Sequence, residues 1–148
     1  MLQAEFSGTD VQVDTLGLLP AAEVSHVLAR SSVLLFVRGY ISSRRGSAIA
    51  GIACGLPIVG YESVDTAWPL TEAGLVLVPE DDRDALSKGL LRVLSDSGLR
   101  QSLRARSREA QQHYFSWTAI ARHVAAALGG ARTDLTDLRV PEIPAKQT

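Results

Sequence analysis

This sequence of 148 residues lacks features that several classes of protein require. It has a single cysteine, Cys54, which cannot form a disulfide within the chain and is typical of a reducing compartment. No apolar run approaches the roughly 20 residues that span a bilayer, and residues 1–10 lack the basic-then-apolar pattern of a signal peptide. We therefore expect a cytoplasmic protein with no membrane span.

The chain also lacks an excess of charge of either sign. It carries 15 Lys and Arg against 16 Asp and Glu, a formal charge of -1, so no overall field draws it to nucleic acid or an anionic membrane. Arg100, Arg104 and Arg108 recur along one face of a predicted helix, but no aromatic residues are interleaved with them. We interpret them as a solvated face rather than a nucleic-acid surface, so any anion site must be local.

Motifs of several enzyme classes are absent. His26, His113 and His123 lie far apart, with no paired-cysteine or His-x-x-x-His spacing, so no metal site is expected. There is no G-x-S-x-G elbow, no Walker A lysine motif and no complete G-x-G-x-x-G, which argues against serine hydrolases, kinases and dehydrogenases. The aspartates at 81, 82 and 84 precede a predicted helix, and we interpret them as capping residues rather than metal ligands.

What the chain does contain is an alternation of strand-like and helix-like segments. Strands are predicted at 11–16, 33–37, 56–59 and 75–78, and helices at 20–30, 47–54, from 81 or 82 to about 96, 99–113 and 116–128. This order predicts an α/β fold with a parallel sheet and right-handed crossovers. Residues 1–10 are expected to be an irregular lead-in, residues 11–130 one domain and residues 131–148 a flexible tail.

The most informative segment is residues 41–60, ISSRRGSAIAGIACGLPIVG. Ser43, Arg44 and Arg45 bring hydroxyls and positive charge to Gly46 and Ser47, where a helix of small residues is expected to begin. The free amides and positive dipole end of such a helix bind anions. We predict a phosphate site here. The alternative is that the small residues serve helix–sheet packing and that the arginines are solvated.

Residues 11 to about 128 resemble the C-terminal, donor-binding half of retaining glycosyltransferases with two facing Rossmann-like domains, the GT-B fold. The likeness rests on landmarks in order, namely VDTLG, SSVLLFV, AIAGIACGLPIVG, EAGLVLVPEDDRDAL and LRQSLRARSREAQQHYFSWTAIA. It implies an incomplete Rossmann-like sheet with helices on both faces. It also implies that the segment from Ser43 to Ser47 cradles the donor diphosphate, while Gly39, Tyr61 and Glu62 lie in loops that approach the nucleotide or sugar. The resemblance implies a nucleotide-sugar substrate, no cofactor and no metal.

Two departures from that family bear on function. Alignment on AGIACGLP places Ser42 and Ala50 where the family commonly carries a pair of glutamates, the second of which bonds the ribose hydroxyls. The family's donor domain also has a βαβ unit and a basic residue ahead of the strand matching 11–16, and a separate acceptor domain. We therefore expect an N-terminally truncated or split enzyme that associates with itself or with a partner chain.

These features leave more than one functional hypothesis open. The first is a glycosyltransferase component that binds a nucleotide-sugar donor and transfers the sugar together with a missing acceptor domain, because activity of this chain alone is not expected. The second is a non-catalytic nucleotide-binding or assembly module of a degenerate transferase, which the missing glutamates favour. The third is an α/β scaffold whose resemblance is architectural only.

Overall fold

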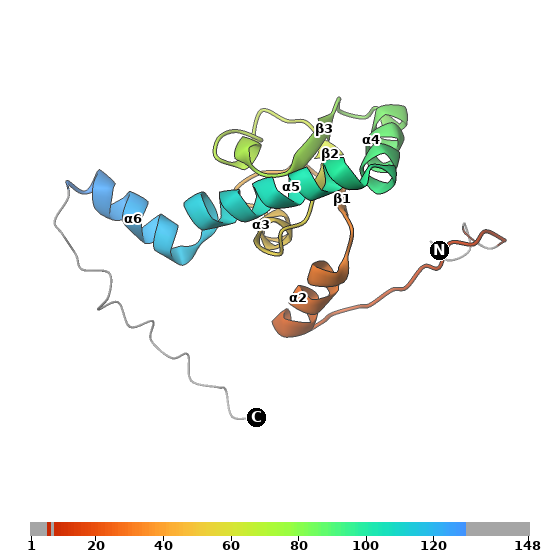
Figure 1. Ribbon diagram of the computed structural model, residues 1–148, viewed down its shortest axis with the longest axis horizontal. Helices are drawn as coiled ribbons and strands as arrows, with labels where there is room; N and C mark the ends of the chain where they lie inside the picture. Colours follow the sequence, from red (N-terminus) through yellow and green to blue (C-terminus); the bar gives the residue numbers. More distant parts are fainter. Residues whose placement is uncertain (1–5, 7, 130–148) are drawn as a thin grey trace.

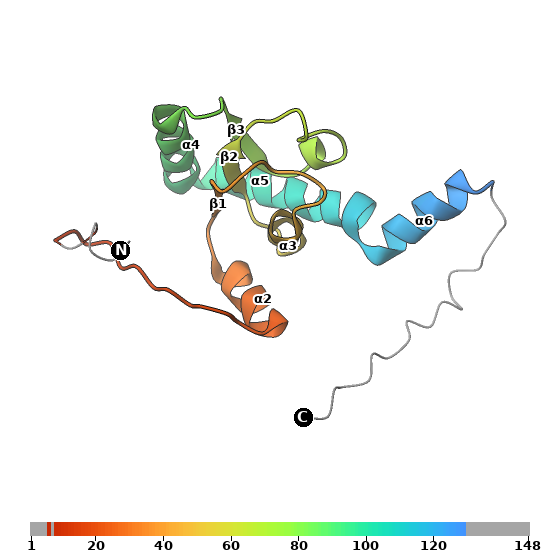
Figure 2. The same cartoon turned by 180° about the vertical axis from the view of Figure 1, so that it is seen from behind.

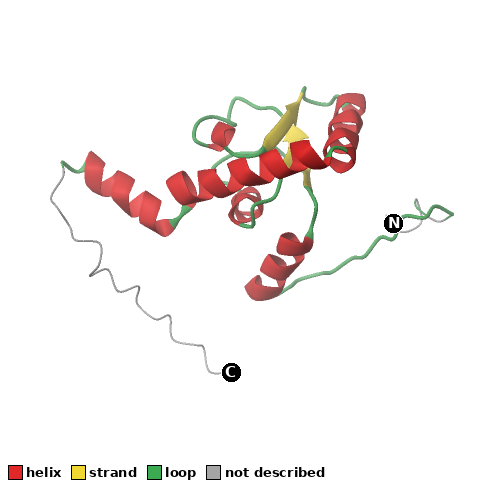
Figure 3. Cartoon of the chain, viewed as in Figure 1, coloured by secondary structure: helices red, strands yellow, loops and turns green. Residues whose placement is uncertain are grey.

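The computed structural model describes residue 6 and residues 8–129. Figure 3 shows a small group of strands surrounded by helices. In chain order the elements are α2 (Ala21–Arg30), β1 (Leu34–Phe36), α3 (Gly46–Ala53), β2 (Ile58–Tyr61), the 3-10 turn η1 (Leu70–Glu72), β3 (Leu75–Val78), α4 (Arg83–Ser95), α5 (Ser97–Ala110), the π-helical turn η2 (Gln111–Phe115) and α6 (Trp117–Ala127).

The predicted α/β fold with a parallel sheet is confirmed. The three strands lie in the order β1-β2-β3 and all pairs are parallel, with Leu34 opposite Ile58 and Ile58 opposite Leu75. Each strand is joined to the next through a helix or a turn, as in a Rossmann-like sheet that lacks part of its strands.

Helices cover both faces of the sheet, as expected. Side chains alternate between the faces along each strand. Ile58 packs in a buried cluster with Ile52 of α3, whereas Val59 packs in a second cluster with Val93 of α4. Figures 1 and 2 show α3 and α4 on different sides of the strands, with α5 running past both and α6 projecting from the body. The α3 side of the sheet therefore carries the helix whose start was predicted to bind phosphate.

Helix α5 is joined to the sheet by one buried hydroxyl. Ser107 is completely buried, and its Oγ donates to the carbonyl of Leu56 (2.8 Å) and accepts from the amide of Gly74 (3.1 Å). These two groups immediately precede β2 and β3 in the chain. A Cβ on Gly74 would lie 2.0 Å from the Leu103 carbonyl oxygen, so only glycine permits this close approach of α5. Ser107 therefore ties the beginnings of two strands to one helix.

The interpretation of the arginine face of α5 as solvated is wrong for Arg100 and Arg104, whereas Arg108 is exposed as expected. Arg100 donates to the carbonyls of Val93 and Leu94 at the end of α4, and Arg104 donates to the carbonyl of Ser31, which follows α2. Carbonyls at helix C-termini lack partners within their own helix, and guanidinium groups satisfy them. These arginines therefore hold helix ends in place.

The local signals for helix ends are confirmed where the structure describes them. Asp82 caps α4 by accepting from the Ala85 amide (2.8 Å), and Ser116 caps α6 by accepting from the Ala119 amide (3.1 Å). Gly55 follows α3 in the left-handed region, with φ of 68°.

The strand predicted at residues 11–16 is wrong. These residues have no regular secondary structure, and Val11 and Leu16 are about half exposed (53% and 52%). In Figure 1 the segment leads away from the start of α2 and does not lie beside β1. The alternating pattern VQVDTL reflects a local preference, but a strand is stabilised by its neighbours and here the sheet provides none. The predicted tail, residues 131–148, and most of the lead-in lie outside the described residues.

The bridge through Ser107 yields a prediction about stability. Replacing Ser107 with alanine leaves the Leu56 carbonyl and the Gly74 amide buried without this partner, so we expect a loss of about 2–3 kcal/mol in the free energy of unfolding. Urea unfolding of Ser107→Ala and of Ser102→Ala, an exposed serine on the same helix, measures the difference. Equal stability of the two variants would contradict the assigned role.

Candidate functional site

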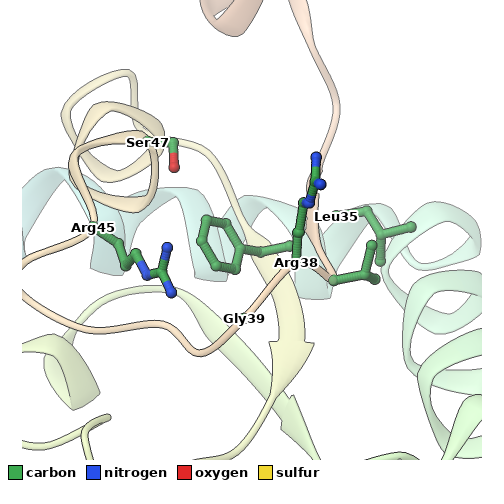
Figure 4. Close-up of a pocket in the computed structure, with 7 residues that line it drawn as sticks. Leu35, Arg38, Gly39, Arg45 and Ser47 are labelled. Carbon is green, nitrogen blue, oxygen red and sulfur yellow. The ribbon is translucent and has the colours of Figure 1, made fainter.

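A pocket of about 470 Å³ opens where β1 ends and α3 begins. Ligands of open parallel sheets bind outside the carboxyl ends of the strands, and this pocket lies at that end of β1. Figure 4 shows Arg45 directed across it toward the turn at Gly39, with Ser47 at the start of α3. Its lining residues are Leu35, Phe36, Val37, Arg38, Gly39, Arg45 and Ser47.

The start of α3 is open toward this pocket. Arg45 is the N-cap residue of α3, and no side chain caps the helix. The amides of Ala48 and Ile49 donate to the Arg45 carbonyl. Gly46 and Ser47 are exposed, and within the described residues their amides have no hydrogen-bond partner. Unpaired amides at a helix start attract anions, and the helix dipole adds to the attraction.

The side chain of Arg45 lies against the backbone of Gly39. Gly39 adopts a left-handed backbone conformation with φ of 80°, and a Cβ there would lie 2.7 Å from Nη2 of Arg45. The guanidinium therefore rests against the bare backbone of Gly39. This arrangement brings a cation from the helix N-cap to the loop that follows β1, next to the unpaired amides.

The other predicted diphosphate residues lie outside the pocket lining. Arg44 forms an ion pair with Asp65 (3.7 Å), and its side chain is largely exposed. Ser43 is exposed as well. Of the residues predicted from Ser43 to Ser47, Arg45 and Ser47 line the pocket, while Gly46 lies between them at the helix start.

Tyr61 and Glu62 come from the neighbouring strand and do not line the pocket. Tyr61 ends β2 opposite Val78, and the Glu62 amide donates to the Val78 carbonyl (2.8 Å). Tyr61 was predicted in the loop but is the last residue of β2, and Glu62 directly follows it, so both lie at the carboxyl edge of the sheet. Gly39, predicted with them as part of the nucleotide or sugar loop, lines the pocket.

The pocket contains residues that sequence reasoning missed. Arg38 supplies a second guanidinium, and Phe36 supplies an apolar wall from the last position of β1. The signal for Arg38 was available, because a charged residue directly after a buried strand lies at the ligand-binding edge of a parallel sheet. No local pattern showed that Phe36, which packs against the core cluster with Ile52 and Ile58, would also line the pocket.

The loop between β1 and α3 is held at several points. Ile41 is completely buried, and its carbonyl accepts from the Thr66 hydroxyl (2.7 Å). The Arg45 amide donates to the Ser42 carbonyl (2.9 Å). The Tyr40 hydroxyl donates to the carboxylate of Glu80, which follows β3. These contacts fix the loop that carries Gly39 and Arg45, so the site does not depend on an unsupported segment.

Comparisons with known proteins do not identify this site. No protein-family model matches the chain, and no curated protein matches it. Within residue 6 and residues 8–129, no helix is long and apolar enough to cross a membrane. The same part of the chain holds no group of three His, Cys, Asp or Glu side chains placed to bind a metal ion.

The contact between Tyr40 and Glu80 yields a prediction about pH. The hydrogen bond to Glu80 raises the pKa of Tyr40, and the charge of Glu80, desolvation and the charge of Asp81 raise it further. An unfolded tyrosine titrates near pH 10, so the contribution of this contact to stability is complete below about pH 10 and is lost as pH rises through the higher folded pKa. Glu80→Gln is expected to lower the pKa of Tyr40.

Carbon-13 spectra of tyrosine Cζ, with Tyr40 assigned through Tyr40→Phe, follow this ionisation directly. Glu62→Gln is the matched control, since Glu62 is also an exposed acid after a strand of the sheet but is not a cause of the Tyr40 shift. A Tyr40 pKa that is equal in the native protein and in Glu80→Gln would contradict the contact.

Proposed function

We propose that this chain binds the diphosphate of a nucleotide-sugar donor and serves as the donor half of a glycosyltransferase. The observation that carries the proposal is the pocket in which the Arg45 guanidinium and the open start of α3 meet at the carboxyl end of β1. The order of landmarks in the sequence adds support, because it resembles the order in the donor half of that family, although residues 11–16 do not form the strand expected there.

The chemistry proposed for this half is stabilisation of the leaving group. In sugar transfer the bond between the anomeric carbon and the diphosphate oxygen breaks, and negative charge develops on the departing diphosphate. Arg45, Arg38 and the amides of Gly46 and Ser47 supply positive charge and donors at one place. Preorganised donors of this kind commonly provide the largest part of transition-state stabilisation. None of these groups requires a metal ion to act.

The acceptor is proposed to bind on a partner domain. Helix α6 projects from the body and has exposed apolar side chains on one face, at Trp117, Ile120, Val124 and Leu128. These residues recur at helical spacing, which is the pattern of a helix that packs against another surface. A contact of α6 with the acceptor domain agrees with the likeness of the closing FSW segment to the family's return toward its partner domain.

One observation favours a second candidate, a non-catalytic module that retains the anion site. Ser42 is buried and Ala50 is half-buried, at the positions where the family carries glutamates. Glu62 and Asp65 lie on the loop after β2 and not in the pocket lining. The family's positions therefore offer no carboxylate for the ribose, while the groups proposed to bind phosphate are present.

Thermal unfolding with UDP, GDP, ADP and dTDP tests donor binding. A ligand at a hundredfold excess over its dissociation constant adds about 2.7 kcal/mol of stability, which corresponds to a rise of about 5–10 °C in Tm for a domain of this size. We expect one nucleotide to give such a shift and Arg45→Ala to abolish it. Arg44→Ala is expected to reduce it less, because Arg44 is paired with Asp65 outside the pocket lining.

Arg122→Ala is the matched control, because Arg122 is an exposed arginine on α6, away from the pocket lining. The proposal fails if no nucleotide shifts the Tm, or if a shift survives Arg45→Ala unchanged. A shift without sugar transfer in the presence of the acceptor domain would favour the non-catalytic module.

A further inference from the structure

Among the residues that the structure describes, no strand pairs with the outer edge of β1. In the order β1-β2-β3, β1 has a neighbour on one side only. The Leu34 amide donates to the Pro57 carbonyl on the β2 side (2.9 Å), so by the alternation of a parallel ladder the amide and carbonyl of Leu35 point outward. An edge with free backbone groups is a template for another strand.

The side chains on this edge are apolar and uncovered. Leu35 and Val37 are exposed (41% and 50%), and the pocket runs along both. The other outer strand, β3, differs, because none of its residues from Leu75 to Val78 is exposed. Of the two sheet edges, β1 is therefore the one that presents both unpaired backbone groups and exposed apolar side chains.

We propose that β1 pairs with β1 of a second copy of this chain, antiparallel and about a two-fold axis at Leu35. In this register Leu35 faces Leu35 of the second copy, and Val33 faces Val37. All of these residues point their amides and carbonyls outward, so each facing pair can exchange two hydrogen bonds. These pairs lie on one face of the sheet, and on the other face Leu34 faces Phe36 of the second copy, so the facing pairs are apolar on both faces.

Charge and symmetry favour a second copy over a different partner. The segment from Ser31 to Val37 carries no charge, and Arg38 faces Ser32 of the second copy, so no like charges are opposed. An antiparallel pair about a two-fold axis uses the free edge of both copies and closes the assembly, whereas a head-to-tail contact of β1 with β3 of a second copy leaves an edge open at each step and continues into a filament. The edge is complementary to itself in this single register.

This inference does not rest on the proposed function, because it uses the edge of β1 and not the arginines. Sedimentation equilibrium is expected to show a monomer–dimer equilibrium whose mass approaches twice the 15.8 kDa of the chain. Leu35→Lys opposes two like charges at the two-fold axis, and we expect it to weaken the dimer at least tenfold. Leu91→Lys, at an exposed leucine of α4, is the matched control and is expected to leave the dimer unchanged.

Cross-linking tests the register even if Leu35→Lys fails to fold. In a Cys54→Ser background, Leu35→Cys is expected to form an intermolecular disulfide on mild oxidation, because facing Cα atoms in such a pair lie about 5.5 Å apart. Leu91→Cys is expected to remain monomeric under the same conditions. A chain that stays monomeric at millimolar concentration, a dimer unaffected by a folded Leu35→Lys, or disulfides that form no faster at position 35 than at position 91 would each overturn the proposal. A dimer that persists in Arg45→Ala supports it and separates it from ligand binding.

Discussion

The hydroxyl of Ser107 is the contact on which the arrangement of the sheet depends. It joins the Leu56 carbonyl and the Gly74 amide, and so fixes where β2 and β3 begin relative to α5. The strands are short, and their parallel register sets which loops meet at the carboxyl edge. Because Ser107 is completely buried, water cannot replace its hydroxyl as the partner of the Leu56 carbonyl and the Gly74 amide unless the core opens. The Ser107 bridge positions β2, and β1 pairs with β2, so the bridge also helps to position the pocket at the carboxyl end of β1.

The pocket places the Arg45 guanidinium and the unpaired amides at the start of α3 at one end of the sheet. Arg100 and Arg104 of α5 donate to backbone carbonyls, and Arg44 is paired with Asp65. Arg45 instead rests on the bare backbone of Gly39 beside a helix start with unpaired amides. The Gly39 conformation, the buried Ile41 and the contact between Tyr40 and Glu80 hold this loop, so the cation and the amides are oriented before any ligand arrives. Preorganisation of this kind lowers the cost of binding.

Local chemistry made much of the fold predictable, and long-range contacts made the rest unpredictable. The caps at Asp82 and Ser116, the stop at Gly55 and the apolar strands follow from short segments, and all are present. The segment at 11–16 has the pattern of a strand but is not part of the sheet. The split between Arg44 and Arg45 depends on Asp65 and Gly39, which lie elsewhere in the chain, so adjacent arginines could not be distinguished from sequence alone.

The central claim is that the amides of Gly46 and Ser47, together with Arg45, hold a diphosphate. Proton–nitrogen correlation spectra during titration with inorganic pyrophosphate measure this most directly, because each backbone amide reports on its own hydrogen bond. The account predicts that the resonances of Gly46 and Ser47 move first and furthest, in a saturable manner. Shifts that leave these two amides in place, or that collect at the arginines of α5 instead, would contradict it.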